Sequence, residues 1–272
     1  MSKKESKIKR IFKATENKNF ISGIYNYCDR WCERCSHTDK CMNYSVSQEF
    51  EKEKKHSDID EENEEFWDNL GSIFADTIDF LYEIAEKEGV DLDDITDEDF
   101  EKAEIEREKM LEFAEKTKHC KLSEKYFEVA DNWFKNSENS FKKKSKQLQT
   151  QIDLELPNND PEKEVELIEE LLEVIEWYLH FINIKLIRAT QSKMQFLEDV
   201  EDNFHLEDAN GSAKVAIIAT KRSISSWAKL MEIFKDDEDE ILDILVVLEK
   251  IYKLSLKEFP KAMEFIRPGL DE

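Results

Sequence analysis

Glycine and proline are scarce in this chain of 272 residues, which has only five glycines and four prolines. All-β proteins need many tight turns, and nucleotide-binding α/β folds need glycine-rich phosphate loops, so both classes lack the residues they require. The chain also lacks an apolar run long enough to span a bilayer, and its basic start is not followed by the apolar stretch of a secretory signal. We therefore expect a soluble, cytoplasmic, helical protein with no membrane partner.

A surplus of positive charge is missing as well, because the formal net charge is -24. Phosphate backbones must be met by Lys and Arg, so we expect no nucleic-acid partner. Residues 51–116 carry 26 acidic against eight basic side chains, whereas residues 1–20 carry seven basic against two acidic ones. Acidic helical faces of this kind are mostly solvated, and they leave open a basic protein partner.

What the chain does contain is apolar residues at helical spacing along most of its length. We expect helices near residues 7–18, 62–89, 97–118, 124–148, 162–196, 213–234 and 239–259. Thr96 and Ser123 are the expected N-caps, Pro161 fits a first turn, and Gly89 and Pro260 end helices. The stretch HLEDANGS, residues 205–212, is expected to interrupt the long helix. The predicted fold is all-α, an antiparallel bundle of about six to eight helices.

Three regions follow from this pattern. Residues 1–56 would hold a basic helix and a cysteine-rich loop, and residues 57–258 the helical bundle, divided into two halves by a linker near residues 149–160. Residues 259–272 would form a C-terminal tail. We find no internal repeat.

Four of the five cysteines lie within the stretch NYCDRWCERCSHTDKCMNY, residues 26–44, which we call the cysteine loop. Their spacing is Cys-x3-Cys-x2-Cys-x5-Cys, and they are Cys28, Cys32, Cys35 and Cys41, the cysteine cluster. Crowded thiolates repel one another, and a cation is the ordinary way to hold several of them at neutral pH. In a reducing cytosol such a group is more typical of a metal site than of disulfides.

Two local spacings resemble known iron–sulfur loops, each over fewer than fourteen residues. Cys28-x3-Cys32-x2-Cys35 is similar to the cluster loop of radical-SAM enzymes, and Cys32-x2-Cys35-x5-Cys41 to part of their auxiliary-cluster domain. The resemblance implies ligation of a [4Fe–4S] cluster. No barrel of alternating strands and helices accompanies it, and Cys41 supplies a fourth ligand, so radical chemistry is not inferred.

The residues around the cysteines fit a cluster, which carries net negative charge. Arg30, Arg34 and Lys40 could offset that charge, and nearby aromatic residues could exclude water: Tyr25, Tyr27, Trp31 and Tyr44. Zinc is the alternative metal, although structural zinc sites usually join two cysteine pairs across a long spacer. Disulfides or packed thiols are the third possibility, and Cys120 is expected to be a half-buried structural thiol.

Carboxylate stripes on two predicted helices suggest a second kind of site. One contains Glu169, Glu173, Glu176 and His180, and the other Glu108, Glu112, Glu115 and His119. Di-metal bundle proteins use such carboxylates and histidines, but at about 100° per residue both stripes point away from the apolar faces of their helices. We expect solvated faces, with one reservation: the long helix is apolar almost all round near His180.

The sequence therefore predicts a protein that holds one [4Fe–4S] cluster on Cys28, Cys32, Cys35 and Cys41, for electron transfer or redox sensing with a redox or basic protein partner. The alternative is a zinc-stabilised acidic helical interaction protein with no catalytic activity. The third function is that of a di-metal carboxylate helical-bundle enzyme. No catalytic residue is assigned, because the chain has no nucleophile–base motif.

Overall fold

Helices make up the regular structure of this chain. The computed structural model describes residues 17–54, 89–154, 160–198 and 203–271 and parts of 71–87, and these residues contain no strand. The α-helices are α2 (Met42–Lys54), α4 (Asp97–Lys116), α5 (Lys118–Asn136), α6 (Glu138–Asp153), α7 (Pro161–Glu198), α8 (Asn203–Ile233) and α9 (Glu238–Glu258). Short 3-10 turns lie at Ile24–Asn26, Cys32–Arg34, Thr38–Lys40, Leu92–Asp94, Lys235–Asp237 and Ala262–Glu264. The predicted all-α, multi-helix fold class is confirmed.

The described residues group into two compact units. One contains those up to Arg107 together with the segment that starts at Arg267, and the other is Glu108–Ile266. The segment predicted as a tail is packed at both ends: Phe259 and Ala262 belong to the core of the second unit, and Gly269 lies against Ile21 in the first.

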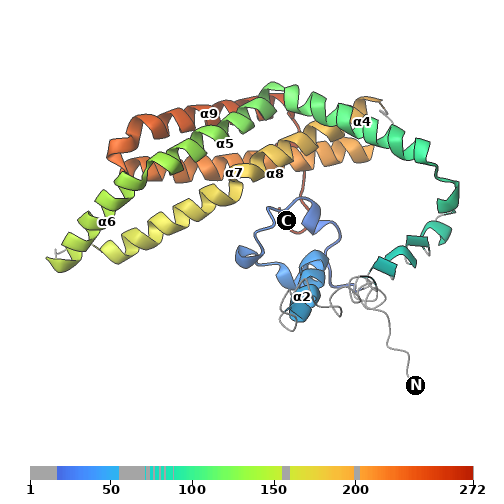
Figure 1. Cartoon of the computed structure of the whole chain (residues 1–272), viewed down its shortest axis with the longest axis horizontal. Helices are drawn as coiled ribbons and strands as arrows, with labels where there is room; N and C mark the ends of the chain where they lie inside the picture. The colour runs from blue at the N-terminus through green and yellow to red at the C-terminus, as the bar shows by residue number, and fades with distance from the viewer. Residues whose placement is uncertain are drawn as a thin grey trace, which may run out of the picture. The chain divides into compact units, whose positions relative to one another are not determined.

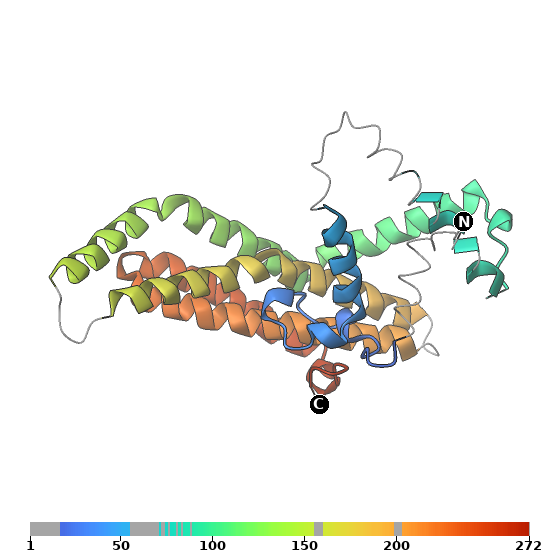
Figure 2. The same ribbon diagram turned by 90° about the horizontal axis from the view of Figure 1, so that it is seen from below.

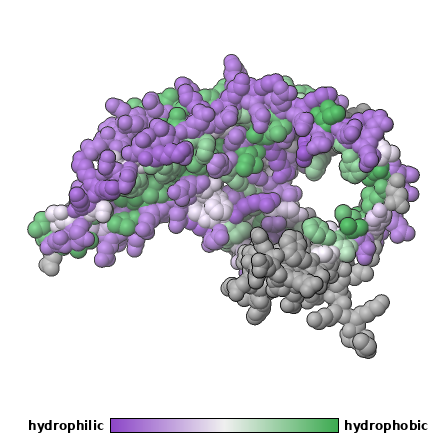
Figure 3. All heavy atoms as spheres, in the orientation of Figure 1, coloured by the Kyte–Doolittle hydropathy of each residue, from purple (hydrophilic) through white to green (hydrophobic). Residues whose placement is uncertain are grey.

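The second unit is built on two long helices. Helices α7 and α8 pack along each other, α9 packs on α8 and α5, and α5 also contacts α7 (Figures 1 and 2). Large side chains that are fully buried form its core: Tyr126, Tyr178, Ile175, Ile182, Leu186, Ile217, Trp227, Leu230, Ile241, Ile244, Leu248 and Ile251. Hydrophilic residues cover most of the visible surface of α5 and α9 (Figure 3). The helices therefore bury their apolar faces as the periodicity predicts.

Local signals set several helix ends. The Thr96 hydroxyl accepts a hydrogen bond from the Asp99 N–H (3.3 Å), and the Asp99 carboxylate accepts one from the Thr96 N–H (3.0 Å), so a capping box starts α4. The Val90 N–H donates to the Ala85 carbonyl (2.8 Å) across Gly89, which has a φ of +73°. This bonding pattern is that of a Schellman motif. Helix α7 begins at Pro161, as predicted.

The predicted break at residues 205–212 is wrong, because α8 runs through them. Gly211 and Ser212 are buried there, and Ala209 and Ala213 form a cluster with Ala189 of α7. Small residues in a helix let a neighbouring helix approach closely, so this composition serves packing rather than termination.

Two expectations about α5 are also wrong. Ser123 is not a cap, because α5 begins at Lys118 and the Ser123 hydroxyl is buried and donates to the Cys120 carbonyl (2.7 Å). The predicted single helix over residues 124–148 is divided at Ser137, which is the C-cap of α5 and the N-cap of α6.

Candidate functional site

The cysteine loop is folded by tight turns rather than by a regular helix. Cys32 begins the 3-10 turn Cys32–Arg34, and Cys35 follows it in an extended conformation, with its N–H bonded to the Cys32 carbonyl (3.1 Å). Cys41 follows the turn Thr38–Lys40 in the same way, with its N–H bonded to the Thr38 carbonyl (3.3 Å). Arg30 takes a left-handed conformation (φ 57°), which bends the chain between Cys28 and Cys32.

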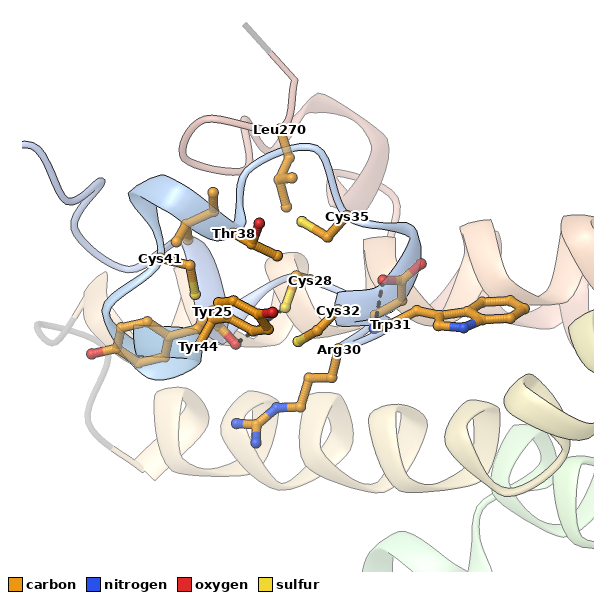
Figure 4. Close-up of a pocket in the computed structure, with 12 residues that line it drawn as sticks. Tyr25, Cys28, Arg30, Trp31, Cys32, Cys35, Thr38, Cys41, Tyr44 and Leu270 are labelled. Carbon is orange, nitrogen blue, oxygen red and sulfur yellow. Dashed lines mark hydrogen bonds between the residues drawn. The ribbon is translucent and has the colours of Figure 1, made fainter. Parts of the chain in front are cut away.

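These turns bring the whole cysteine cluster to one small cavity of about 30 Å³. Figure 4 shows the four thiol side chains around it, together with Tyr25, Tyr44 and Leu270. All four thiols are free of disulfides and partly buried. The structure thus brings together the four residues that the sequence singles out.

Burial raises the pKa of the Cys32 thiol, and the neighbouring Cys28 and Cys41 raise it further. Without a cation, Cys32 therefore favours its neutral form. Two backbone groups contact the other sulfurs: the His37 N–H donates to Cys35 Sγ (3.4 Å), and Cys28 Sγ donates to the Tyr25 carbonyl (3.7 Å). Backbone N–H groups that donate to sulfur are among the contacts by which a protein supports metal-bound thiolates.

The C-terminal segment closes one side of the cavity, which the sequence did not predict. Leu270 is one of its lining residues. The turn that carries Leu270 is held by Arg267, whose guanidinium donates to the Asp271 carboxylate (2.7 Å) and whose N–H donates to the same carboxylate (2.9 Å). Gly269 packs so tightly that an added Cβ would lie 2.6 Å from Ile21 Cδ1.

Basic and aromatic residues surround the cysteines as the sequence suggests. Arg30 and Trp31 line the cavity, and the Arg34 guanidinium lies over the Trp31 ring, 4.1 Å from its centroid. This stacking holds a positive charge next to the cysteine loop.

A single metal ion and a cluster place different demands on these thiols. Zinc holds its sulfur ligands about 2.3 Å away, so the four sulfurs must converge on one point. Within the described part of the chain, no three His, Cys, Asp or Glu side chains form a group that could hold a metal ion. In this structure the four cysteines line the cavity without forming such a group.

The first carboxylate stripe is solvated. Glu169, Glu173, Glu176 and His180 are all exposed on α7. The His180 ring stacks on Phe127 with 4.3 Å between the ring centroids. The reservation that His180 is buried is therefore not supported.

The second stripe is divided between two helices. Glu108, Glu112 and Glu115 are exposed on α4, but His119 is buried, which contradicts the expected solvated face. The reason is a change of register, because α4 ends at Lys116 and α5 starts at Lys118. His119 Nε2 lies 2.8 Å from the Thr190 hydroxyl, and desolvation lowers its pKa.

Two further groups are structural: Cys120, which was expected to be a half-buried structural thiol, and Asp208, which the sequence analysis missed. Cys120 is fully buried beside Thr190, with Sγ 3.9 Å from the Thr190 hydroxyl, and burial raises its pKa. Asp208 is buried and accepts hydrogen bonds from Arg188 (Nε, 3.1 Å) and from the Ser192 hydroxyl (2.6 Å). Asp208 thus anchors Arg188 of α7 to α8.

Compared with protein-family models, curated proteins and solved structures, the chain has no match. Among the residues that the structure describes, no helix has the length and apolar character needed to cross a membrane.

Proposed function

We propose that this protein holds one [4Fe–4S] cluster on Cys28, Cys32, Cys35 and Cys41 and uses it for electron transfer or redox sensing. The observation that carries the proposal is that all four thiols of one short loop line a single cavity. Four thiolates are the usual ligand set of a cubane cluster.

The contiguous spacing of the four cysteines favours the cluster over zinc, because structural zinc sites usually join two cysteine pairs across a long spacer. In a cubane each thiolate binds a different iron, so the ligands stand apart around the cluster. A single zinc ion would need them at one point. The cavity is small, so cluster binding requires the turns to open slightly around it.

The composition of the walls suits a redox centre. Tyr25, Tyr44 and Leu270 place apolar surface around the thiols, and Arg30 brings positive charge to the same cavity. Low polarity and nearby cations both act on the potential of a cluster. With a cysteine for each iron, the cluster would have no open iron for a substrate, which favours electron transfer or sensing over catalysis.

The proposal is tested on protein purified without oxygen. We expect a brown protein with a broad absorption shoulder near about 400 nm and equal amounts of iron and acid-labile sulfide. Reduction with dithionite should bleach the shoulder, and exposure to air should show whether the centre is stable or sensitive to oxygen.

Variants locate the ligands. Cys41→Ser should lower iron and sulfide content and destabilise the centre. Cys120→Ser is the matched control, because Cys120 is buried in the second unit beside Thr190, and it should keep full iron content. Full occupancy in Cys41→Ser would remove Cys41 from the ligand set. A colourless protein with one zinc per chain would overturn the cluster and favour the zinc-stabilised interaction protein.

A further inference from the structure

Several large apolar side chains are exposed along residues 74–100. They are Phe74, Ile78, Leu81, Val90, Ile95 and Phe100. A single exposed apolar residue is ordinary at a protein surface, but a group of them within one short segment is typical of an interaction surface. This segment is therefore a candidate binding surface.

Three of these side chains lie on one side of a helix. The described residues between 74 and 87 are helical, and Phe74, Ile78 and Leu81 follow one another at steps of four and three residues. At about 100° per residue they fall within about 60° of one another around the helix, and we call them the apolar stripe. Their exposed fractions are 60%, 53% and 52%, so each is more than half exposed. A helix normally packs such a stripe against a partner.

The next long helix also leaves apolar side chains uncovered. Helix α4 has 20 residues and buries only Ala114, whereas α5, with 19 residues, buries six. Phe100 in the first turn of α4 is exposed, and α4 makes no extensive contact with another element of the described chain. The apolar stripe is thus followed by a helix that lacks a packed face of its own.

The charges of this segment are almost all negative. Residues 71–107 hold 14 acidic and three basic side chains. Asp79 and Glu86 are exposed on the helix of the apolar stripe, and α4 starts with three acidic residues. Exposed charges act over a Debye length of about 8–10 Å, which is comparable to the diameter of a helix. A partner bound to the apolar stripe therefore lies within the negative potential of these acids.

This negative charge selects among the possible occupants of the apolar stripe. A second copy of the chain would bring an equal negative charge and would be repelled. Helices that lie on anionic membranes carry Lys and Arg on their polar face, whereas residues 71–86 contain neither. A helix that has Lys and Arg beside an apolar face complements both the apolar stripe and the surrounding acids.

We propose that the apolar stripe binds a basic amphipathic helix of a partner protein. Apolar side chains of that helix cover Phe74, Ile78 and Leu81, and its Lys and Arg side chains are attracted by the neighbouring acids. The surface shares no residue with the lining of the cysteine cavity, and it does not depend on the proposed redox function.

Three peptides of about 15 residues, long enough to form a helix, test this recognition. The first consists of Lys and Leu, with the Leu residues at helical spacing so that they form one face. The second has Glu in place of Lys, and the third has the composition of the first with its Leu residues distributed around the helix. Binding to the full chain is measured by calorimetry. We expect only the first peptide to bind tightly, with a negative heat-capacity change because apolar surface is buried, and added salt should weaken this binding.

Substitutions then locate the binding on the apolar stripe. Leu81→Ala should weaken the first peptide about fivefold, because about half of a leucine side chain loses its contact. Leu242→Ala is the matched control, since Leu242 of α9 is exposed to a similar extent (49%) and should leave the affinity within about twofold. The double variant Asp79→Asn with Glu86→Gln should weaken the binding mainly at low salt. All four residues are exposed, so folding is not at risk.

Several results would overturn the proposal. These are no binding of the first peptide, or equal binding of the first and third peptides, which would show attraction by net charge alone. Equal losses in Leu81→Ala and Leu242→Ala would place the binding elsewhere. Self-association of the free chain in sedimentation, if Leu81→Ala reduces it, would make a second copy the occupant in place of a basic partner.

Discussion

The substitution Gly269→Ala adds one methyl group, and we expect it to loosen the C-terminal segment from the cysteine loop. The φ of Gly269 is +67°, a conformation that costs an L-residue about 1–2 kcal/mol. An added Cβ would lie 2.6 Å from Ile21 Cδ1 and 3.1 Å from Ile21 Cγ2. Cδ1 can rotate away, but Cγ2 moves only with the whole side chain, so crowding adds about 1 kcal/mol. Gly269→Ala should therefore destabilise the packed segment by about 2–3 kcal/mol.

The assay is the reaction of the cluster thiols with a small disulfide reagent, in protein freed of metal by a chelator. Leu270 lines the cysteine cavity, so the thiols become accessible when the C-terminal segment opens. If opening is a rapid pre-equilibrium, the rate follows the population of the open state. A change of about 2–3 kcal/mol then raises the rate about 30- to 150-fold.

Gly89→Ala is the matched control. Gly89 has nearly the same backbone conformation (φ +73°), but an added Cβ there would meet nothing within 4 Å. It should leave the thiol reaction within about twofold of the wild-type rate, because distant sites act independently. Ile21→Ala should partly rescue Gly269→Ala by removing the crowded atoms. Equal rates in Gly269→Ala and the wild type would refute the idea that the C-terminal segment covers the cysteine cavity.

Two further predictions concern the second unit. Burial lowers the pKa of His119, so on acidification its imidazole is protonated in the unfolded state before it is protonated in the folded state. The free energy of unfolding should therefore fall as the pH drops below about 6.5, by at most about 1.4 kcal/mol per pH unit. In urea unfolding between pH 5 and 8, His119→Gln should flatten this dependence, and parallel curves for the variant and the wild type would contradict it. Asp208→Asn should lower the free energy of unfolding by about 1–3 kcal/mol, because it weakens the anchor of the partly exposed Arg188. Asp236→Asn, which breaks an exposed pair, should lower it by less than about 1 kcal/mol, and equal losses would show that burial of Asp208 is unimportant.

The positions of most helices could be predicted from the sequence, because helix formation depends mainly on residues that are close together in the chain. The capping residues Thr96 and Asp99, Pro161 at the start of α7 and Gly89 at a helix end each act within one turn, and all are found where expected. Apolar periodicity then sets which face of each helix is buried.

Predictions failed where the answer depended on a neighbouring element. Gly211 and Ser212 look like a break in isolation, yet small residues suit the close approach of α7 to α8. The solvated position expected for His119 assumed one continuous helix, and a single irregular residue, Thr117, between α4 and α5 rotates His119 into the core. Placing a side chain by about 100° per residue is reliable only while the helix is unbroken.

The cysteine loop combines both cases. Its spacing singles out four residues, and the structure gathers all four at one cavity, because short turns fix the positions of residues that are close in sequence. The wall supplied by Leu270 comes from the other end of the chain, and spacing carries no information about it. A weak local signal did exist: Pro268-Gly269 marks a turn, and a large apolar residue follows it. The Arg267–Asp271 pair holds this turn through contacts of its own, so Leu270 is presented to the cavity by a preformed element. A preformed turn loses little entropy on docking, which explains how so short a segment can pack against the cysteine loop.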